Sequence, residues 1–293
     1  EGIKPAYKQR LHEQFDAEAQ TLKDPATESL SKINNWVAKE TDNHITNLLD
    51  ELDAGTGAVI VNAVYFNGVW ETPFKKHNTA PKGRFTLLDG KVEPCALMRI
   101  VNEEYYYDNG LFQAVMKPYK SGKIAAVFVL PKQEGPDALS NVEDAVIKAF
   151  CTGSEMRRSF APRHWGGSGK RKVDLRVPRF KLEEKLSLKG HLQSVGVKQA
   201  FSPEKAEFQD MSDVPLYISD VIHSATLEVT EEGTVAAAAT AVEFKRCIAP
   251  RPPPVPPPMV SCDRPFYFAI VDTADMDAMF LGRVTKPELL DMP

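Results

Sequence analysis

The stretch that most constrains this chain is residues 227–240, which read Leu-Glu-Val-Thr-Glu-Glu-Gly-Thr-Val-Ala-Ala-Ala-Ala-Thr. Its first half alternates apolar Leu227 and Val229 with polar neighbours, the period of two that is typical of a half-buried strand. Beyond Gly233 almost every side chain is small, and alanine favours helices over strands. Because nothing in this second half is bulky enough to clash between two existing strands, we expect a loop that can be added to a sheet later.

Every second residue of this loop would face the same way if it became a strand. The residues on one such face are Thr234, Ala236, Ala238 and Thr240. A flexible linker is the simpler interpretation of a run of small residues. Linkers, however, are richer in glycine and serine than in alanine and threonine. The composition therefore favours a loop that inserts into a core.

Composition places the chain among ordinary globular proteins, with 43% hydrophobic and 26% charged residues over a length of 293. The net formal charge is −4 and the pI about 5.9, so the basic excess that binds nucleic acid is missing. No apolar run of about 18 residues, the length that a membrane span needs, occurs in the sequence. We therefore expect no nucleic-acid partner and no membrane partner. The protein is also expected to be a monomer.

The cysteine pattern indicates neither a metal site nor a disulfide framework. The four cysteines are Cys95, Cys151, Cys247 and Cys262. They show no Cys-x-x-Cys spacing, which favours free thiols. No Asn-x-Ser/Thr sequon occurs either. Both facts favour an intracellular location, although the compartment is otherwise left open.

Signatures of the common enzyme classes are absent from the sequence. It contains no Gly-x-Ser-x-Gly, no His-Glu-x-x-His and no dinucleotide-binding pattern, and residues 166–170 lack the spacing of a phosphate-binding loop. The histidines are scattered along the chain, at positions 12, 44, 77, 164, 191 and 223. We expect a protein that is not an enzyme and that needs no cofactor and no metal.

Patterning along the chain predicts a mixture of helices and strands. A helix should follow the Asp24-Pro25 start signal, after an N-terminal helix that passes into an edge strand near residues 15–22. Residues 58–66 are apolar at both alternating positions, which indicates a strand buried on both faces, with Asn62 as a buried polar exception. Other strands are expected within residues 85–130, 173–180, 211–230, 265–272 and 278–284, and other helices at 138–150 and 186–195.

The sequence resembles a known family in several places. Glu231-Glu-Gly-Thr-Val-Ala-Ala-Ala-Ala-Thr-Ala, preceded by residues 218–223, is similar to the proximal hinge of the reactive-centre loop of inhibitory serpins, most closely of plant-type members. Residues 62–70, 173–180, 200–203 and 280–287 also resemble serpin segments, in the expected order. The match runs from about residue 24 to residue 287.

The resemblance implies an α+β fold with a large mixed β-sheet, two smaller sheets and surrounding helices. Residues 1–293 would form a single serpin domain that lacks the N-terminal helices of the family, with its reactive-centre loop at about residues 231–260. The helix after residue 25 would lie across the main sheet and move when the loop inserts. The proline-rich residues 250–258 would form extended chain near the end of the loop.

The resemblance also implies three groups of site residues. The hinge comprises Glu231, Glu232, Gly233, Thr234, Val235, Ala236, Ala237, Ala238, Ala239 and Thr240. The shutter beneath the opening strands comprises Asn62 and His223, whose serine partners belong to a helix missing here. The reactive bond lies within Arg246, Cys247 and Ile248: an arginine suits a trypsin-like pocket, whereas the family spacing favours the Cys247–Ile248 bond.

The implied function is suicide inhibition of a serine endopeptidase, expected to be trypsin-like, with a cysteine protease as a variant target. Two alternatives remain open at this point. One is a non-inhibitory serpin that acts as a binding or carrier protein. The other is an inactive fragment, or a degenerate loop that engages no protease.

Overall fold

The computed structural model describes residues 2–22, 26–52, 55–151, 170–234, 256–286 and 288–290. The chain divides into two compact units. Unit 1 contains Glu1–Tyr65 and Glu183–Thr226, and unit 2 contains Phe66–Leu182 and Leu227–Pro293. Within the described part of the chain, no helix combines the length and the apolar character needed to cross a membrane.

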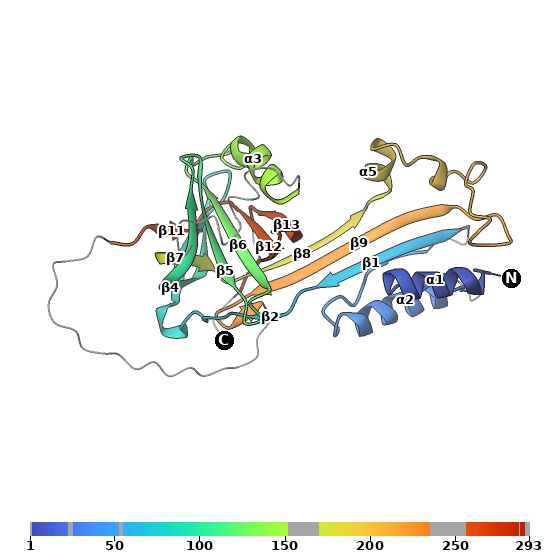
Figure 1. Ribbon diagram of the computed structural model, residues 1–293, viewed down its shortest axis with the longest axis horizontal. Coiled ribbons are helices and arrows are strands. Elements are labelled where there is room, and N and C mark those ends of the chain that lie inside the picture. Colours follow the sequence, from blue (N-terminus) through green and yellow to red (C-terminus); the bar gives the residue numbers. More distant parts are fainter. Residues whose placement is uncertain are drawn as a thin grey trace. The chain divides into compact units, whose positions relative to one another are not determined.

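Unit 1 is built on two long strands that pair in parallel. Its elements are α1 (Pro5–Phe15), α2 (Ala26–Glu40), β1 (Ala58–Tyr65), α5 (Lys189–Ser194), the 3₁₀ helix η3 (Gln199–Phe201) and the greater parts of β8 (Phe180–Ser187) and β9 (Ile218–Val229). β1 pairs with β9, and the register places Asn62 opposite His223. α2 runs beside β1 (Figure 1), and its Val37 is fully buried against apolar residues of both strands.

The structure corrects two expectations for unit 1. β1 is covered on one face only, where Val59 and Val61 pack against the α2 cluster, whereas Ile60 on the other face is 47% exposed. Burial of this strand on both faces is therefore wrong for the described residues. Residues 16–22 form no strand, and α1 ends before them at Asp16, which takes a left-handed conformation (φ 49°).

Unit 2 contains an eight-stranded sheet in the order β11-β7-β4-β5-β6-β12-β13, with β3 paired to β4. The strands are β3 (Ala80–Thr86), β4 (Val92–Asp108), β5 (Phe112–Pro118), β6 (Ile124–Pro131), β7 (Lys170–Pro178), β11 (Met259–Ser261), β12 (Phe266–Asp272) and β13 (Ala278–Val284). Shorter elements complete it: β2 (Gly68–Val69), the 3₁₀ helix η1 (Lys76–Asn78), α3 (Ser140–Cys151), β10 (Gly233–Thr234) and β14 (Glu288–Leu289).

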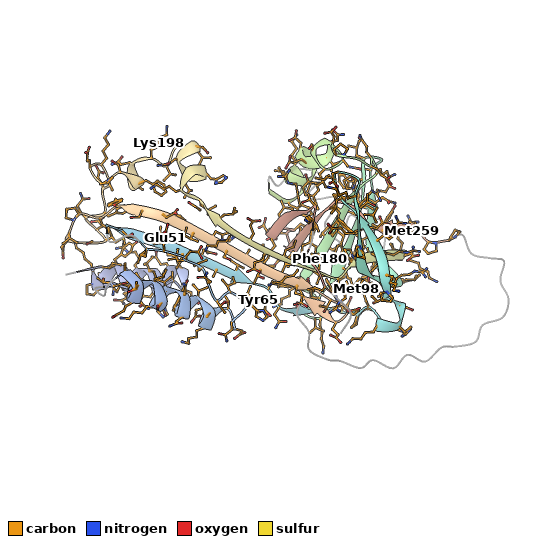
Figure 2. All side chains as sticks on the ribbon, turned by 180° about the vertical axis from the view of Figure 1, so that it is seen from behind. Glu51, Tyr65, Met98, Phe180, Lys198 and Met259 are labelled. Atoms are coloured by element: carbon orange, nitrogen blue, oxygen red, sulfur yellow. The ribbon has the colours of Figure 1, made fainter. Side chains whose placement is uncertain are left out.

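The core of unit 2 lies on both faces of the sheet. In β6, Val127 and Val129 point to a cluster under α3, while Phe128 points to the opposite cluster. That opposite cluster also holds Met98 and Phe180, which are labelled in Figure 2. A strand covered on both faces reads as a continuous apolar run, which explains the sequence of β6.

Candidate functional site

The structure describes the first part of the predicted hinge, from Glu231 to Thr234. Residues 235–240 of the hinge and the predicted reactive bond at Arg246, Cys247 and Ile248 lie outside the described residues. The hinge therefore begins at residues 231–234, which lie in unit 2 and contact other residues of that unit.

The chain turns back directly after β9. The backbone N–H of Thr230 donates to the carbonyl of Gly233 (2.8 Å), and the antiparallel strand β10 follows. β10 lies between β9 and β2, with Thr234 opposite Val229 on one side and opposite Gly68 on the other. A Cβ on Gly233 would collide with the carbonyl oxygen of Gly68, so this close backbone approach requires glycine.

Residues 70–74, which we call the hinge clasp, hold three successive carbonyl groups of the turn. The backbone N–H of Trp70 donates to Glu232 (3.0 Å), and the indole N–H of Trp70 donates to Thr230 (3.0 Å). The backbone N–H of Phe74 donates to Glu231 (2.8 Å). The start of the loop is thus fixed by backbone groups as well as by side chains.

Glu231 is only 2% exposed and lies in a polar site inside unit 2. Its carboxylate accepts a hydrogen bond from the Thr79 hydroxyl (2.8 Å) and lies 3.2 Å from Nε of Arg179. Glu232, one residue later, is partly exposed and pairs with the exposed Lys76 (3.1 Å). The two acidic residues of the hinge therefore differ in burial.

Thr234 is fully buried, and its hydroxyl lies 2.7 Å from the hydroxyl of Tyr119. Burial raises the pKa of the Tyr119 phenol, so this hydroxyl stays protonated and can donate. The Tyr119 ring stacks on Trp70 with 4.4 Å between ring centroids. Tyr119 therefore links the clasp to the last described residue of the hinge.

Sequence reasoning missed Thr79, Tyr119 and Arg179 as partners of the hinge. Arg179 lies inside the segment 173–180 that resembles the family, so that segment could have pointed to it. Nothing in the local pattern distinguishes Thr79 or Tyr119 from other polar residues at strand ends.

In unit 1 the structure brings the two predicted shutter residues together. Oδ1 of Asn62 lies 3.2 Å from Nδ1 of His223. Asn62 is exposed and His223 half-buried, so the expectation of a buried Asn62 is wrong for the described residues. Each of the two polar groups has the other as a partner.

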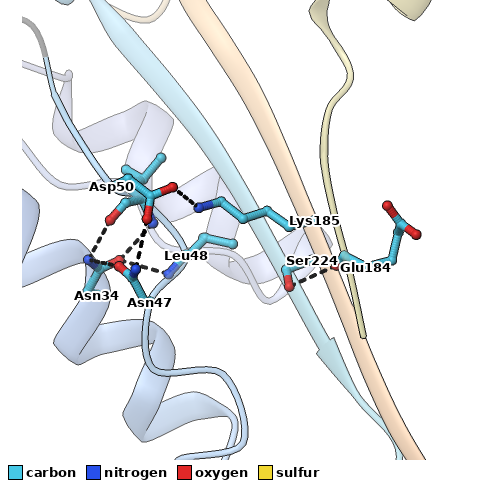
Figure 3. Close-up of polar contacts among 8 residues, drawn as sticks. Asn34, Asn47, Leu48, Asp50, Glu184, Lys185 and Ser224 are labelled. Atoms are coloured by element: carbon cyan, nitrogen blue, oxygen red, sulfur yellow. Dashed lines mark hydrogen bonds and ion pairs between the residues drawn. The ribbon is translucent and has the colours of Figure 1, made fainter. Parts of the chain in front are cut away.

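A polar network fastens the segment that follows α2, which we call the cover segment (residues 45–50). Oδ1 of Asn34 accepts from the backbone N–H groups of Leu48 (3.0 Å) and Leu49 (2.9 Å), and its Nδ2 donates to the Leu49 carbonyl (2.8 Å). The side chain of Asn47 donates to Asp50 (2.8 Å), and Lys185 of β8 donates to the same carboxylate (2.6 Å; Figure 3). Helix α2 and the cover segment thus lie over the apolar face of the β1–β9 pair.

No group of three His, Cys, Asp or Glu side chains that could hold a metal ion occurs among the described residues. The site consists of a backbone turn that follows β9, and hydrogen bonds from the hinge clasp hold this turn in place.

Comparisons with known proteins agree with this geometry. The family model described as serpin (serine protease inhibitor) matches residues 1–287. Among relatives, "Putative serpin-Z6A" of Oryza sativa subsp. japonica is 34% identical over 272 residues, 89% of this chain and 68% of that protein.

Two solved structures extend the comparison. Serpin48 of the insect Tenebrio molitor matches with a TM-score of 0.79 and 27% identity, over 97% of this chain and 72% of that one. Human thyroxine-binding globulin complexed with thyroxine matches with a TM-score of 0.81, over 98% of this chain and 72% of that one, and at 24% identity the likeness concerns the fold alone. The predicted α+β fold class is confirmed by these likenesses.

Proposed function

The chain belongs to the serpin family of protease inhibitors, and we propose that it is a suicide-substrate inhibitor of a trypsin-like serine endopeptidase. The loop that starts at Glu231 would serve both as bait for the protease and as the strand that later inserts.

The position of β10 supports this proposal most directly. Its two residues already form a strand between β9 and β2, and Thr234 is buried there as the alternating pattern requires. In unit 1, β1 and β9 pair directly with each other. Insertion beyond Thr234 would continue β10 as a new strand and exchange the β1–β9 pairing for pairing with the loop.

The energy available from this exchange is large enough to drive it. Each added hydrogen bond contributes about 0.5–1.5 kcal/mol net. About a dozen would contribute on the order of 10 kcal/mol, which is comparable with the stability of a whole domain. Small side chains at every second position allow the strand to enter without a clash.

The inhibitory chemistry is that of an interrupted hydrolysis. The serine of the protease attacks the carbonyl carbon of Arg246 or of Cys247, expels the amine of the following residue and forms an acyl-enzyme. Insertion of the loop then drags the bound protease away from its docking position. The distortion removes donors from the oxyanion hole, so water no longer completes the reaction.

Incubation with trypsin tests the proposal. We expect an SDS-stable covalent complex and a released C-terminal peptide that begins at Cys247 or Ile248, identified by mass spectrometry. A cut loop without any covalent complex would contradict inhibition and support a binding protein. A covalent complex with papain but not with trypsin would instead assign a cysteine protease as the target.

A pair of charge substitutions tests the role of insertion. Thr234→Arg should turn the inhibitor into a substrate, because a charged side chain cannot stay in the buried site of Thr234 and β10, from which insertion would start, would leave the sheet. Val235→Arg is the matched control, since the alternation places this residue on the opposite face. Equal stoichiometries of inhibition for the two variants would refute insertion along this register.

A further inference from the structure

Unit 2 contains an ion pair that is almost completely buried. Lys117 of β5 and Glu104 of β4 have side chains that are 1% and 3% exposed, with 3.1 Å between Nζ and Oε1. Burial lowers the pKa of Lys117, although the charge of Glu104 acts in the opposite direction. A buried pair of this kind is seldom better for stability than two apolar residues of the same size. The other contacts of Lys117 therefore indicate a role for this pair besides stability.

Glu104 also accepts a hydrogen bond from the side chain of Asn102 (3.2 Å), whereas the other contacts of Lys117 are with the hinge clasp. Nζ of Lys117 donates to the Thr72 carbonyl at 2.7 Å. The same ammonium group lies 5.6 Å from the ring centroid of Trp70 and 4.9 Å from that of Phe74, within the range of cation–π attraction. One charged group thus contacts the first, the middle and the last residue of the clasp.

The two end residues are the ones that hold the loop. Trp70 and Phe74 supply the three N–H groups that bind the carbonyls of residues 230–232. A shift of either ring would move these donors, since each lies on the same residue as the ring. Trp70 and Phe74 therefore each contact both the ammonium group of Lys117 and the carbonyls at the start of the loop.

We propose that Lys117, paired with Glu104, is the positioning residue of the hinge clasp and that it holds residues 230–232 so that β10 stays docked. Insertion would start from docked β10, so a loosened clasp slows insertion and gives the protease time to hydrolyse the acyl bond. This last step rests on the proposed function, whereas the grip on the hinge does not.

Hydrogen exchange at single amides, measured by NMR, tests the grip. The test variant replaces both partners, Lys117→Met with Glu104→Leu, so that no buried charge is left unpaired. Lys123→Met, an exposed lysine close to the same strand, is the matched control. We expect exchange at the Trp70 and Phe74 amides to become about tenfold faster in the double variant and to stay unchanged in the control.

The amides of Val115 and Val127, in β5 and β6, separate positioning from general stability. They should keep their wild-type exchange rates. Unchanged rates at Trp70 and Phe74, or an equal increase at all four amides, would overturn the proposal. Glu104→Gln keeps the size of the side chain, and it should show a smaller increase at the same two amides if the double variant does not fold.

The stoichiometry of inhibition of trypsin tests the consequence for insertion. We expect the double variant to consume several inhibitor molecules per protease where the wild type consumes fewer. Faster exchange at the clasp with an unchanged stoichiometry would overturn the link to insertion. If the wild type forms no complex at all, the proposed inhibition fails, while the exchange experiment still decides the role of Lys117.

Discussion

Glu231 and Glu232 are chemically identical neighbours that the structure places in different surroundings. Glu231 is buried between Thr79 and Arg179, while Glu232 is partly exposed and pairs with the exposed Lys76. The sequence marks both as hinge residues and does not tell them apart. Only the turn that follows β9 decides which carboxylate points inward.

Removing the buried carboxylate should destabilise the protein far more than removing its neighbour. Glu231→Ala removes the buried carboxylate that pairs with Arg179 and accepts from Thr79, which costs about 3–5 kcal/mol. Glu232→Ala breaks a pair whose lysine is exposed to solvent, which is worth about 0–1 kcal/mol. Urea unfolding of the two variants measures both, and equal unfolding midpoints would contradict the assignment of Glu231 to the interior.

The buried thiol of Cys95 gives a second prediction at this scale. Burial raises its pKa from 9.0 to about 11, and the charge of Asp263 adds to the increase. Because the thiolate is the reactive form, alkylation of folded Cys95 should keep accelerating up to about pH 11, whereas an unfolded thiol levels off near pH 9. The thiol of the unfolded chain ionises at a lower pH than the thiol of the folded chain. The stability that the folded chain gains from the raised pKa of Cys95 is therefore fully present below pH 9 and is lost between pH 9 and about 11.

Peptide mapping after iodoacetamide treatment measures that rate, with the chain unfolded in urea as the control. Equal labelling of Cys95 in the folded and unfolded chain at pH 8 would show that the thiol is accessible after all.

At the scale of elements, α2 and its cover segment show how one side chain fixes a stretch of chain. Asn34 binds the backbone of Leu48 and Leu49, whose side chains are buried against β1 and β9. The helical spacing of apolar residues predicts α2. No pattern predicts that the polar residue next to that stripe would hold a segment fourteen positions later.

Asn34→Ala should therefore loosen the cover segment. The substitution leaves two buried N–H groups and one carbonyl of that segment without their partner, a loss of about 1–3 kcal/mol. Asn35→Ala, at an exposed position of the same helix, should change stability by less than about 0.5 kcal/mol. Thermal unfolding of the two variants distinguishes them, and a neutral Asn34→Ala would mean that the network adds nothing to the folded state.

At the scale of the whole molecule, the two units divide the proposed machinery between them. Unit 2 anchors the loop through Glu231, Thr234 and the hinge clasp. Unit 1 contains the β1–β9 pair that insertion would separate. The conversion of the whole molecule would therefore appear as a change in global stability.

Cutting the loop with trypsin should raise the melting temperature. A gain on the order of 10 kcal/mol corresponds to a rise of roughly 15 °C for a protein of this size. The Thr234→Arg variant, cut in the same way, should show no such rise. A crystal structure of the cut wild-type protein in which β1 and β9 are still paired would contradict insertion of the loop.

The sequence by itself determined the alternation in the strands, the apolar stripe of α2 and the small residues of the hinge, since these depend on spacing along one segment. Tertiary structure alone decided the clasp, the partner of Glu231 and the buried Lys117. Trp70 and Thr230 are 160 positions apart, and only the folded sheet brings them within 3.0 Å. Local periodicity indicates which face of an element is apolar, but it contains no information about which distant residue will cover that face.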